Sequence, residues 1–153
     1  MENNEADLIW SLSWRQPEEV QRAAMEAIVS DPDFDPTRLL MPIGKAYWEN
    51  AAICLRRMGY PRTVHALNGM LGWLKDMNWP GADVILSFLE CYPKEALRLA
   101  YEKAVAQAVK DRDRDWLEGL SCLAREQRIL REDFKNPRLY DTVVQSIRNT
   151  GKR

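Results

Sequence analysis

The stretch WLKDMNWPGADVILSFL, residues 73–89, decides the fold. It joins the end of one predicted helix to the start of the most apolar helix in the chain, through a corner at residues 75–80. Proline has no N–H and its ring clashes with the preceding helical turn, so we expect Pro80 in the first turn of the second helix. Apolar residues between Val84 and Leu89 cover nearly the whole helix circumference. This pattern predicts a helix that is buried on several sides at the centre of the fold.

Two interpretations of the corner stay open. In the structural one, Asp76 and Asn78 bond to free backbone N–H groups, and Trp79 is a buried aromatic that packs against its neighbours. In the functional one, Asp76, Asn78 and Trp79, together with Trp73, form a hydrogen-bonding and aromatic patch of the composition typical of binding hot spots. These four residues are therefore candidate protein-binding residues.

The rest of the chain also follows helical patterns, and no run shows the period-two alternation of a half-buried strand. Pro42, Pro61, Pro80 and Pro93 divide the middle of the chain at intervals of 13 to 19 residues. This spacing suits helix pairs of about 30–45 residues, the repeat unit of HEAT and armadillo proteins. We therefore predict an all-α, HEAT/armadillo-like solenoid of antiparallel pairs with about seven or eight helices, and a compact helical bundle is the alternative.

Length and composition indicate one soluble globular domain over residues 1–153, with 46% hydrophobic residues. The acidic N-terminus has no signal-peptide pattern, and no apolar run is long enough to cross a membrane. Cys54, Cys91 and Cys122 are widely spaced, each within a helical pattern. We expect them to be buried, reduced thiols, which places the protein in the cytoplasm.

The sequence predicts no enzyme, no cofactor and no metal site. No CxxC pair is present, and His65 is the only histidine. A catalytic triad would have to include His65, but no serine or cysteine is placed by local sequence to pair with it. His65 shares one flank of a predicted helix, from Pro61 to about Asp76, with Gly69 and Gly72. Two internal glycines cost a helix about 2 kcal/mol relative to alanine, so we expect either a closely packed neighbouring helix or a partner that needs bare backbone.

Charge is uneven along the chain, although the net charge is only −1. Residues 1–35 hold nine acidic and two basic side chains, whereas residues 110–153 hold eleven basic and eight acidic ones. Glu19 and Glu26 lie on the polar side of a predicted helix that Pro17 opens. Complementary charge speeds the encounter of two proteins, so this acidic third predicts a basic partner.

The string Trp73-Leu-Lys-Asp-Met-Asn-Trp-Pro80, preceded by Arg57-Met-Gly-Tyr-Pro61, resembles a family of small, uncharacterised bacterial domains. The similarity spans roughly residues 47–127, and the W-L-x-D-M-N-W-P motif is its specific part. The resemblance implies a HEAT-like helical-repeat fold and a bacterial origin. The family has no established activity. Small helical-repeat proteins of this kind recur as immunity proteins, which neutralise toxins by binding them.

Together these observations predict a protein-binding module, most concretely an immunity-type inhibitor of a basic toxin domain. Its candidate binding residues are Trp73, Asp76, Asn78, Trp79, His65, Glu19 and Glu26. The alternative is a HEAT-like protein that binds DNA lesions, which would need a basic groove for phosphates and aromatic side chains for an exposed base. The acidic first third makes binding to nucleic acid the less favoured prediction.

Overall fold

The computed structural model describes residues 2–150, and side chains over residues 4–146. Within that range the regular secondary structure is entirely helical and includes no strand, which confirms the all-α fold class. The eight α-helices of the described part are α1 Glu2–Trp10, α2 Glu18–Ser30, α3 Lys45–Met58, α4 Leu67–Trp73, α5 Ala82–Glu90, α6 Lys94–Lys110, α7 Arg114–Gln127 and α8 Pro137–Thr150. Three short 3-10 turns join them: η1 Pro36–Leu39, η2 Val64–Ala66 and η3 Arg131–Asp133.

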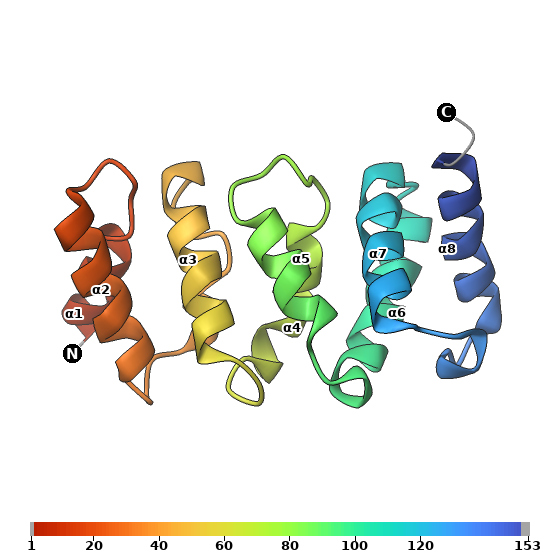
Figure 1. The fold of residues 1–153 in the computed structure, drawn as a ribbon, viewed down its shortest axis with the longest axis horizontal. Helices are drawn as coiled ribbons and strands as arrows, with labels where there is room; N and C mark the ends of the chain where they lie inside the picture. The colour runs from red at the N-terminus through yellow and green to blue at the C-terminus, as the bar shows by residue number, and fades with distance from the viewer. Residues whose placement is uncertain (1, 151–153) are drawn as a thin grey trace.

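The helices stand side by side in a row that follows chain order from α1 to α8 (Figure 1). In this view α2, α3, α5 and α7 lie in front, and α1, α4 and α6 lie behind them. The packing agrees: α3 contacts α2 and α5, α4 contacts α6, and α7 contacts both α6 and α8. α5 therefore lies in the middle of the row, as its apolar sequence predicts.

The core runs through both layers of the row. α5 contributes Ala82, Ile85 and Leu89, each fully buried. The largest fully buried side chains are Trp73 at the end of α4 and Tyr101 in α6. Burying a polar side chain is costly unless it is hydrogen-bonded, and the Tyr101 hydroxyl donates to the Leu120 carbonyl at 2.6 Å. None of the helices in the described residues combines the length and apolar character needed to cross a bilayer.

The helix expected from Pro61 to Asp76 is much shorter in the structure. Residues 60–63 form a turn, η2 follows, and the α-helix runs only from Leu67 to Trp73. The reason is tertiary: the Arg62 guanidinium reaches back to cap the end of α2, donating to the Val29 carbonyl at 2.7 Å and to the Asp31 carbonyl. Free carbonyls at a helix C-terminus need such donors, and holding Arg62 there keeps this segment out of a regular α-helix.

Pro80 does not open α5, contrary to expectation. The helix begins at Ala82 and its N-cap is Gly81, whose φ of +86° lies in the left-handed region. A side chain at this position would strain the backbone, and its Cβ would also lie 2.8 Å from the Ala52 Cβ. Gly81 thus turns the chain into α5, and Pro80 stays in the loop.

The glycines of α4 have different surroundings. A Cβ on Gly69 would overlap the Leu40 side chain, so this glycine permits close packing of the segment that follows η1, not of the neighbouring helix that was expected. A Cβ on Gly72 would meet nothing within 4 Å. A third glycine that the sequence pattern did not single out, Gly119 in α7, lies so near α4 that its Cβ would be 2.5 Å from the Leu74 carbonyl oxygen.

The three cysteines are not all buried. Cys54 is buried, and burial raises the pKa of its thiol to about 12. Cys122 is half-buried. Cys91 is exposed, so the expectation of a buried thiol is wrong there. The physical reason is that α5 ends at Glu90, and Cys91 lies in the turn that follows instead of on a buried helix face.

Candidate protein-binding edge

Three connections meet around the first turn of α3, although they are far apart in the sequence. The loop at 11–17 is held by the Trp14 N–H, which donates to the Ala46 carbonyl at 3.0 Å. The segment 40–44 is held by Trp48, whose indole N–H donates to the Pro42 carbonyl at 3.2 Å. The loop at 74–81 is held by the Gly81 N–H, which donates to Glu49 Oε2 at 2.6 Å. We call the surface formed by these three loops and the first turn of α3 the aromatic edge; it runs along the top of Figure 1.

The name reflects where the tryptophans lie. All six fall within the described residues, in these loops or at the helix ends beside them: Trp10, Trp14, Trp48, Trp73, Trp79 and Trp116. Their exposure separates them into three pairs. Trp73 and Trp116 are buried, Trp48 and Trp79 are half-buried, and Trp10 and Trp14 are exposed. The edge thus has a structural part and a part that faces solvent.

Trp73 is the structural centre of the edge. It is fully buried, and its indole N–H donates to the Pro80 carbonyl at 2.9 Å across the 74–81 loop. Trp48 packs against it edge-on, with ring centroids 6.5 Å apart. Edge-to-face pairs of this kind are favoured by the ring quadrupoles. Trp73 is fully buried, so it offers no surface to a partner and instead holds the 74–81 loop in place.

The other corner residues follow the structural interpretation in part. Asp76 closes an Asx turn, because its Oδ1 accepts the Asn78 N–H at 2.8 Å. The Asn78 side chain is exposed. Trp79 is half-buried instead of buried, and it packs edge-on against Trp48 at 5.7 Å. Asn78 and Trp79 are therefore within reach of a partner.

The most exposed apolar residues of the edge were not among those that the sequence singled out. Ile43 is 61% exposed, Trp10 57% and Trp14 53%. The Trp10 ring packs against the Tyr47 ring of α3, with ring centroids 5.7 Å apart. These residues come from the end of α1, the 11–17 loop and the segment before α3, so only the folded structure brings them together. We call Trp10, Trp14, Ile43 and Tyr47 the solvent-facing patch.

The backbone at Ile43 is strained as well as exposed. Its φ is +57°, in the left-handed region that a β-branched residue rarely adopts. Non-glycine residues held there cost about 1–3 kcal/mol and cluster at functional sites. The Gly44 N–H, which donates to the Pro42 carbonyl at 2.6 Å, closes the tight turn that holds Ile43 in place.

His65 and the two glutamates lie apart from the corner residues. His65 is exposed in η2, before α4, whereas Trp73 is the last residue of α4, so the two belong to opposite ends of that helix. Glu19 is exposed in the first turn of α2. Glu26, further along α2, forms an ion pair with Arg57 of α3 at 2.5 Å. The structure therefore does not bring the seven candidate residues into one site.

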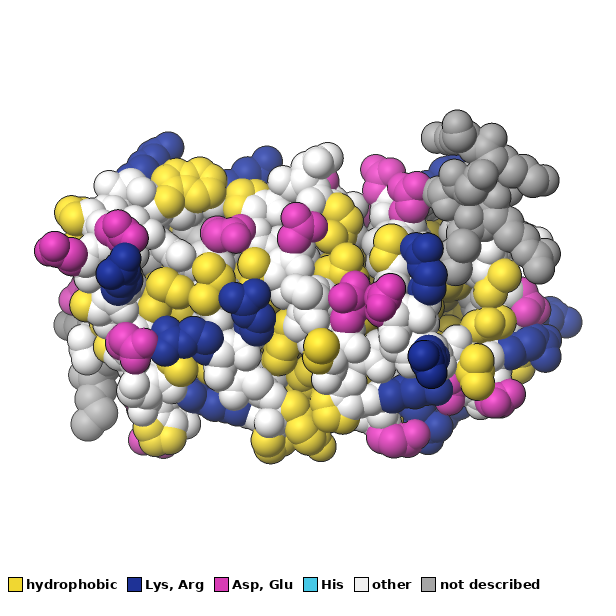
Figure 2. Space-filling model, in the orientation of Figure 1, with side chains coloured by type: hydrophobic (Ala, Val, Ile, Leu, Met, Phe, Trp, Pro, Cys, Tyr) yellow, Lys and Arg dark blue, Asp and Glu magenta, His cyan; other side chains and the backbone are white. Residues whose placement is uncertain are grey.

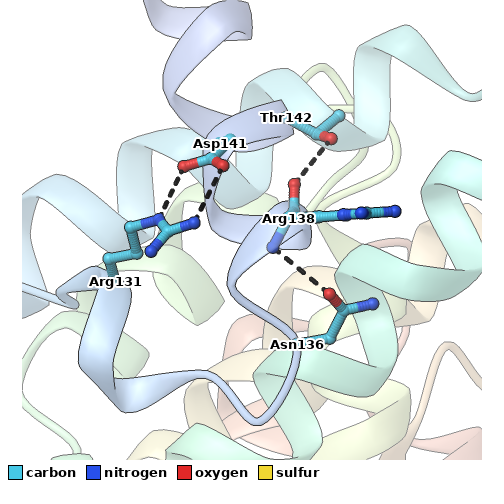
Figure 3. A network of polar contacts seen from close by, with 5 residues as sticks. All are labelled: Arg131, Asn136, Arg138, Asp141 and Thr142. Atoms are coloured by element: carbon cyan, nitrogen blue, oxygen red, sulfur yellow. Dashed lines mark hydrogen bonds and ion pairs between the residues drawn. The ribbon is translucent and has the colours of Figure 1, made fainter.

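Ion pairs neutralise part of the charge carried after residue 110. Arg131 makes two contacts with Asp141, at 3.1 and 3.4 Å (Figure 3). Lys94 pairs with Asp133 at 2.6 Å. In the same view the Arg138 backbone, not its guanidinium, makes the contacts with Asn136 and Thr142. In residues 4–146 no group of three or more His, Cys, Asp or Glu side chains is arranged to hold a metal ion.

Comparison with known proteins places the chain in a protein family. Residues 49–147 match the family model described as "Domain of unknown function (DUF5071)". The chain belongs to this family. No curated protein and no solved structure matches the chain significantly. The DUF5071 match begins one residue after Trp48 and covers the 74–81 loop, whereas the solvent-facing patch lies before it. Membership of an uncharacterised family, expected from the corner motif, is thereby confirmed.

Proposed function

We propose that this member of the DUF5071 family is a non-enzymatic, HEAT-like helical-repeat module that binds another protein through its aromatic edge. One observation carries the proposal: large apolar side chains are exposed at the edge of a packed helical frame, at Trp10, Trp14 and Ile43. Tryptophan is among the residues most enriched at binding hot spots, and contiguous exposed apolar surface marks interaction sites.

In its most concrete form, the protein is a bacterial, cytoplasmic immunity-type inhibitor that neutralises a basic toxin domain. The acidic N-terminal third supports a basic partner, but ion pairs within the chain reduce the negative charge that is free to attract one. Glu18 pairs with Arg22 at 2.7 Å and Glu26 pairs with Arg57, so part of this charge is already neutralised within the chain. Glu19 is exposed and forms no ion pair in the described residues, and it is the better probe.

The proposal is tested by recovering the partner from a cell extract with the immobilised protein and then expressing the partner alone and together with this chain. We expect the partner to stop growth when it is expressed alone and to be harmless in co-expression. Glu19→Lys should slow association and weaken its salt dependence, because a surface charge that steers encounter acts mainly on the association rate. Glu118→Lys, on α7, is the matched control, because Glu118 is also exposed and forms no ion pair in the described residues.

Lesion-binding remains the alternative, favoured by the exposed tryptophans alone. It predicts that Glu19→Lys strengthens the hold on DNA, because less acid faces the phosphates. Binding of duplex DNA by the wild-type protein at about micromolar concentration in physiological salt, where non-specific binding is typically weaker, would contradict the protein-binding proposal.

A further inference from the structure

We propose that Met41, Pro42 and Ile43, which we call the strap, open outward while the rest of the fold stays intact. Opening releases the indole N–H of Trp48 from the Pro42 carbonyl, which is its hydrogen-bond partner in the closed form. The inference describes the protein by itself and goes beyond the proposed function, because it holds whether or not the aromatic edge binds a partner.

Backbone strain is concentrated in the strap. Met41 has a φ of +45° and Ile43 a φ of +57°, both in the left-handed region that side chains with a Cβ disfavour. Arg112 and Arg128 also have a positive φ, but they follow α6 and α7, where a left-handed residue is an ordinary way to end a helix. The strap instead carries two such residues within three positions, and one of them is β-branched.

Few hydrogen bonds hold the strap closed. The Pro42 carbonyl accepts the Gly44 N–H at 2.6 Å and the Trp48 indole N–H at 3.2 Å. Within the described residues the backbone N–H groups of Met41 and Ile43 donate to no acceptor. The net stabilisation from one hydrogen bond is no larger than the strain at one such residue, so strain at two residues offsets both bonds. The packing of half-buried Met41 against the core keeps the closed form the major one.

The strap is fixed at both ends and open on its outer side. Before it, Leu40 packs so closely on α4 that a Cβ on Gly69 would lie 2.4 Å from Leu40 Cδ1. After it, the Gly44 carbonyl accepts the Tyr47 N–H at 3.0 Å. Ile43 is 61% exposed, and a Cβ on Gly44 would meet nothing within 4 Å. Figure 2 shows hydrophobic side chains at the surface of this upper edge, above α2 and α3. The strap therefore has room to swing outward without moving a helix.

Opening changes the aromatic edge at Trp48. The Trp48 ring packs edge-on against Trp73 at 6.5 Å and against Trp79 at 5.7 Å, and these contacts do not involve the strap. The ring therefore stays in place when the Pro42 carbonyl moves away, and its N–H becomes a donor without an acceptor in the chain. Indole N–H groups donate only, so the released group bonds to water or to an oxygen of another molecule. The closed strap masks this donor.

The test is hydrogen exchange of the indole N–H groups, followed by NMR in urea concentrations below the unfolding transition. Trp48, Trp73 and Trp116 each donate to a backbone carbonyl, so each exchanges only after its bond opens. A local opening exposes little surface and is nearly insensitive to urea, whereas global unfolding responds strongly. We expect the Trp48 exchange rate to stay almost constant as urea rises, and the Trp73 rate to increase steeply.

Ile43→Asn tests whether strain causes the opening. Asparagine adopts the left-handed region more readily than isoleucine, so the closed strap should gain stability. Exchange of the Trp48 indole should then slow by about fivefold or more, although the substitution removes an apolar side chain. Ile43→Val keeps the branched Cβ and the strain, and should leave the rate within about twofold of the wild-type value. Arg112→Asn relieves the same kind of strain after α6 and should not change the Trp48 rate.

Two results would overturn the inference. If the Trp48 rate follows the Trp73 rate as urea rises, the strap opens only when the whole domain unfolds. If Ile43→Asn exchanges its Trp48 indole as fast as the wild type or faster, strain at Ile43 does not drive the opening. Both measurements use the protein without a partner, so their failure leaves the proposed function standing, and failure to recover a partner leaves the strap standing.

Discussion

Removal of Trp73 should destabilise the domain far more than removal of Trp79, although Trp73 ends α4 and Trp79 lies in the loop that follows it. Trp73 is fully buried, and truncation of a buried tryptophan to alanine costs about 3–5 kcal/mol. The lost indole N–H bond to the Pro80 carbonyl adds about 1 kcal/mol. We therefore expect Trp73→Ala to lower the free energy of unfolding by about 4–6 kcal/mol, a large share of the stability of a typical domain.

Trp79 is half-buried and its main aromatic contact is with Trp48, so Trp79→Ala should cost only about 1–2 kcal/mol of unfolding free energy. Trp73→Phe isolates the hydrogen bond, because it keeps a large ring in the core but leaves the Pro80 carbonyl without its indole donor. It should cost about 1–3 kcal/mol.

Urea unfolding followed by circular dichroism measures all three variants, since the midpoint and slope give the free energy of unfolding of a two-state domain. Circular dichroism is preferable to fluorescence here because the variants remove tryptophans. A loss for Trp79→Ala as large as that for Trp73→Ala would refute the reasoning. It would mean that the 74–81 loop is held by the Trp48–Trp79 contact instead of by Trp73.

The remaining predictions concern thiols and glycines. In the native protein Cys91 should react with a thiol reagent at the rate of a free cysteine. Cys54 should react only after unfolding, because it is buried and its pKa of about 12 keeps the thiol protonated at neutral pH. Mass spectrometry of labelled peptides checks this, and rapid native labelling of Cys54 would disprove it. Gly72→Ala should raise the free energy of unfolding by about 0.5–1 kcal/mol, since a Cβ there meets open space. Gly119→Ala should lower it by about 1–3 kcal/mol, because the new Cβ would press on the Leu74 carbonyl, and urea unfolding that gave the same sign for both would contradict this account.

The all-α class and the central place of α5 were predictable because both depend on local patterns. The prolines between apolar runs indicate the succession of helices. The apolar residues on all sides between Val84 and Leu89 indicate the central helix. The start of α5 was not predictable from Pro80 alone. Gly81 turns the chain with a positive φ that favours glycine, and Ala52, which is distant in the sequence, also leaves no room for a Cβ there.

The candidate site was harder to predict, because its exposed residues are assembled by folding. Trp10, Trp14 and Ile43 lie in separate segments without a shared motif, and they become neighbours only when α1 and the 11–17 loop pack against α3. A tryptophan in a sequence is more easily interpreted as core than as surface. The one local signal at Ile43 was its position between Pro42 and Gly44, a typical tight-turn setting.

Hydrogen exchange of the protein with and without its recovered partner tests the central claim most directly. It measures protection of backbone amides across the whole chain, so it locates the binding surface without any substitution. We predict that binding slows exchange of amides in residues 11–17 and 43–48, at the aromatic edge. Protection confined to η2 and the turn that holds Cys91, at the opposite edge of the row, would contradict the claim that the aromatic edge binds the partner.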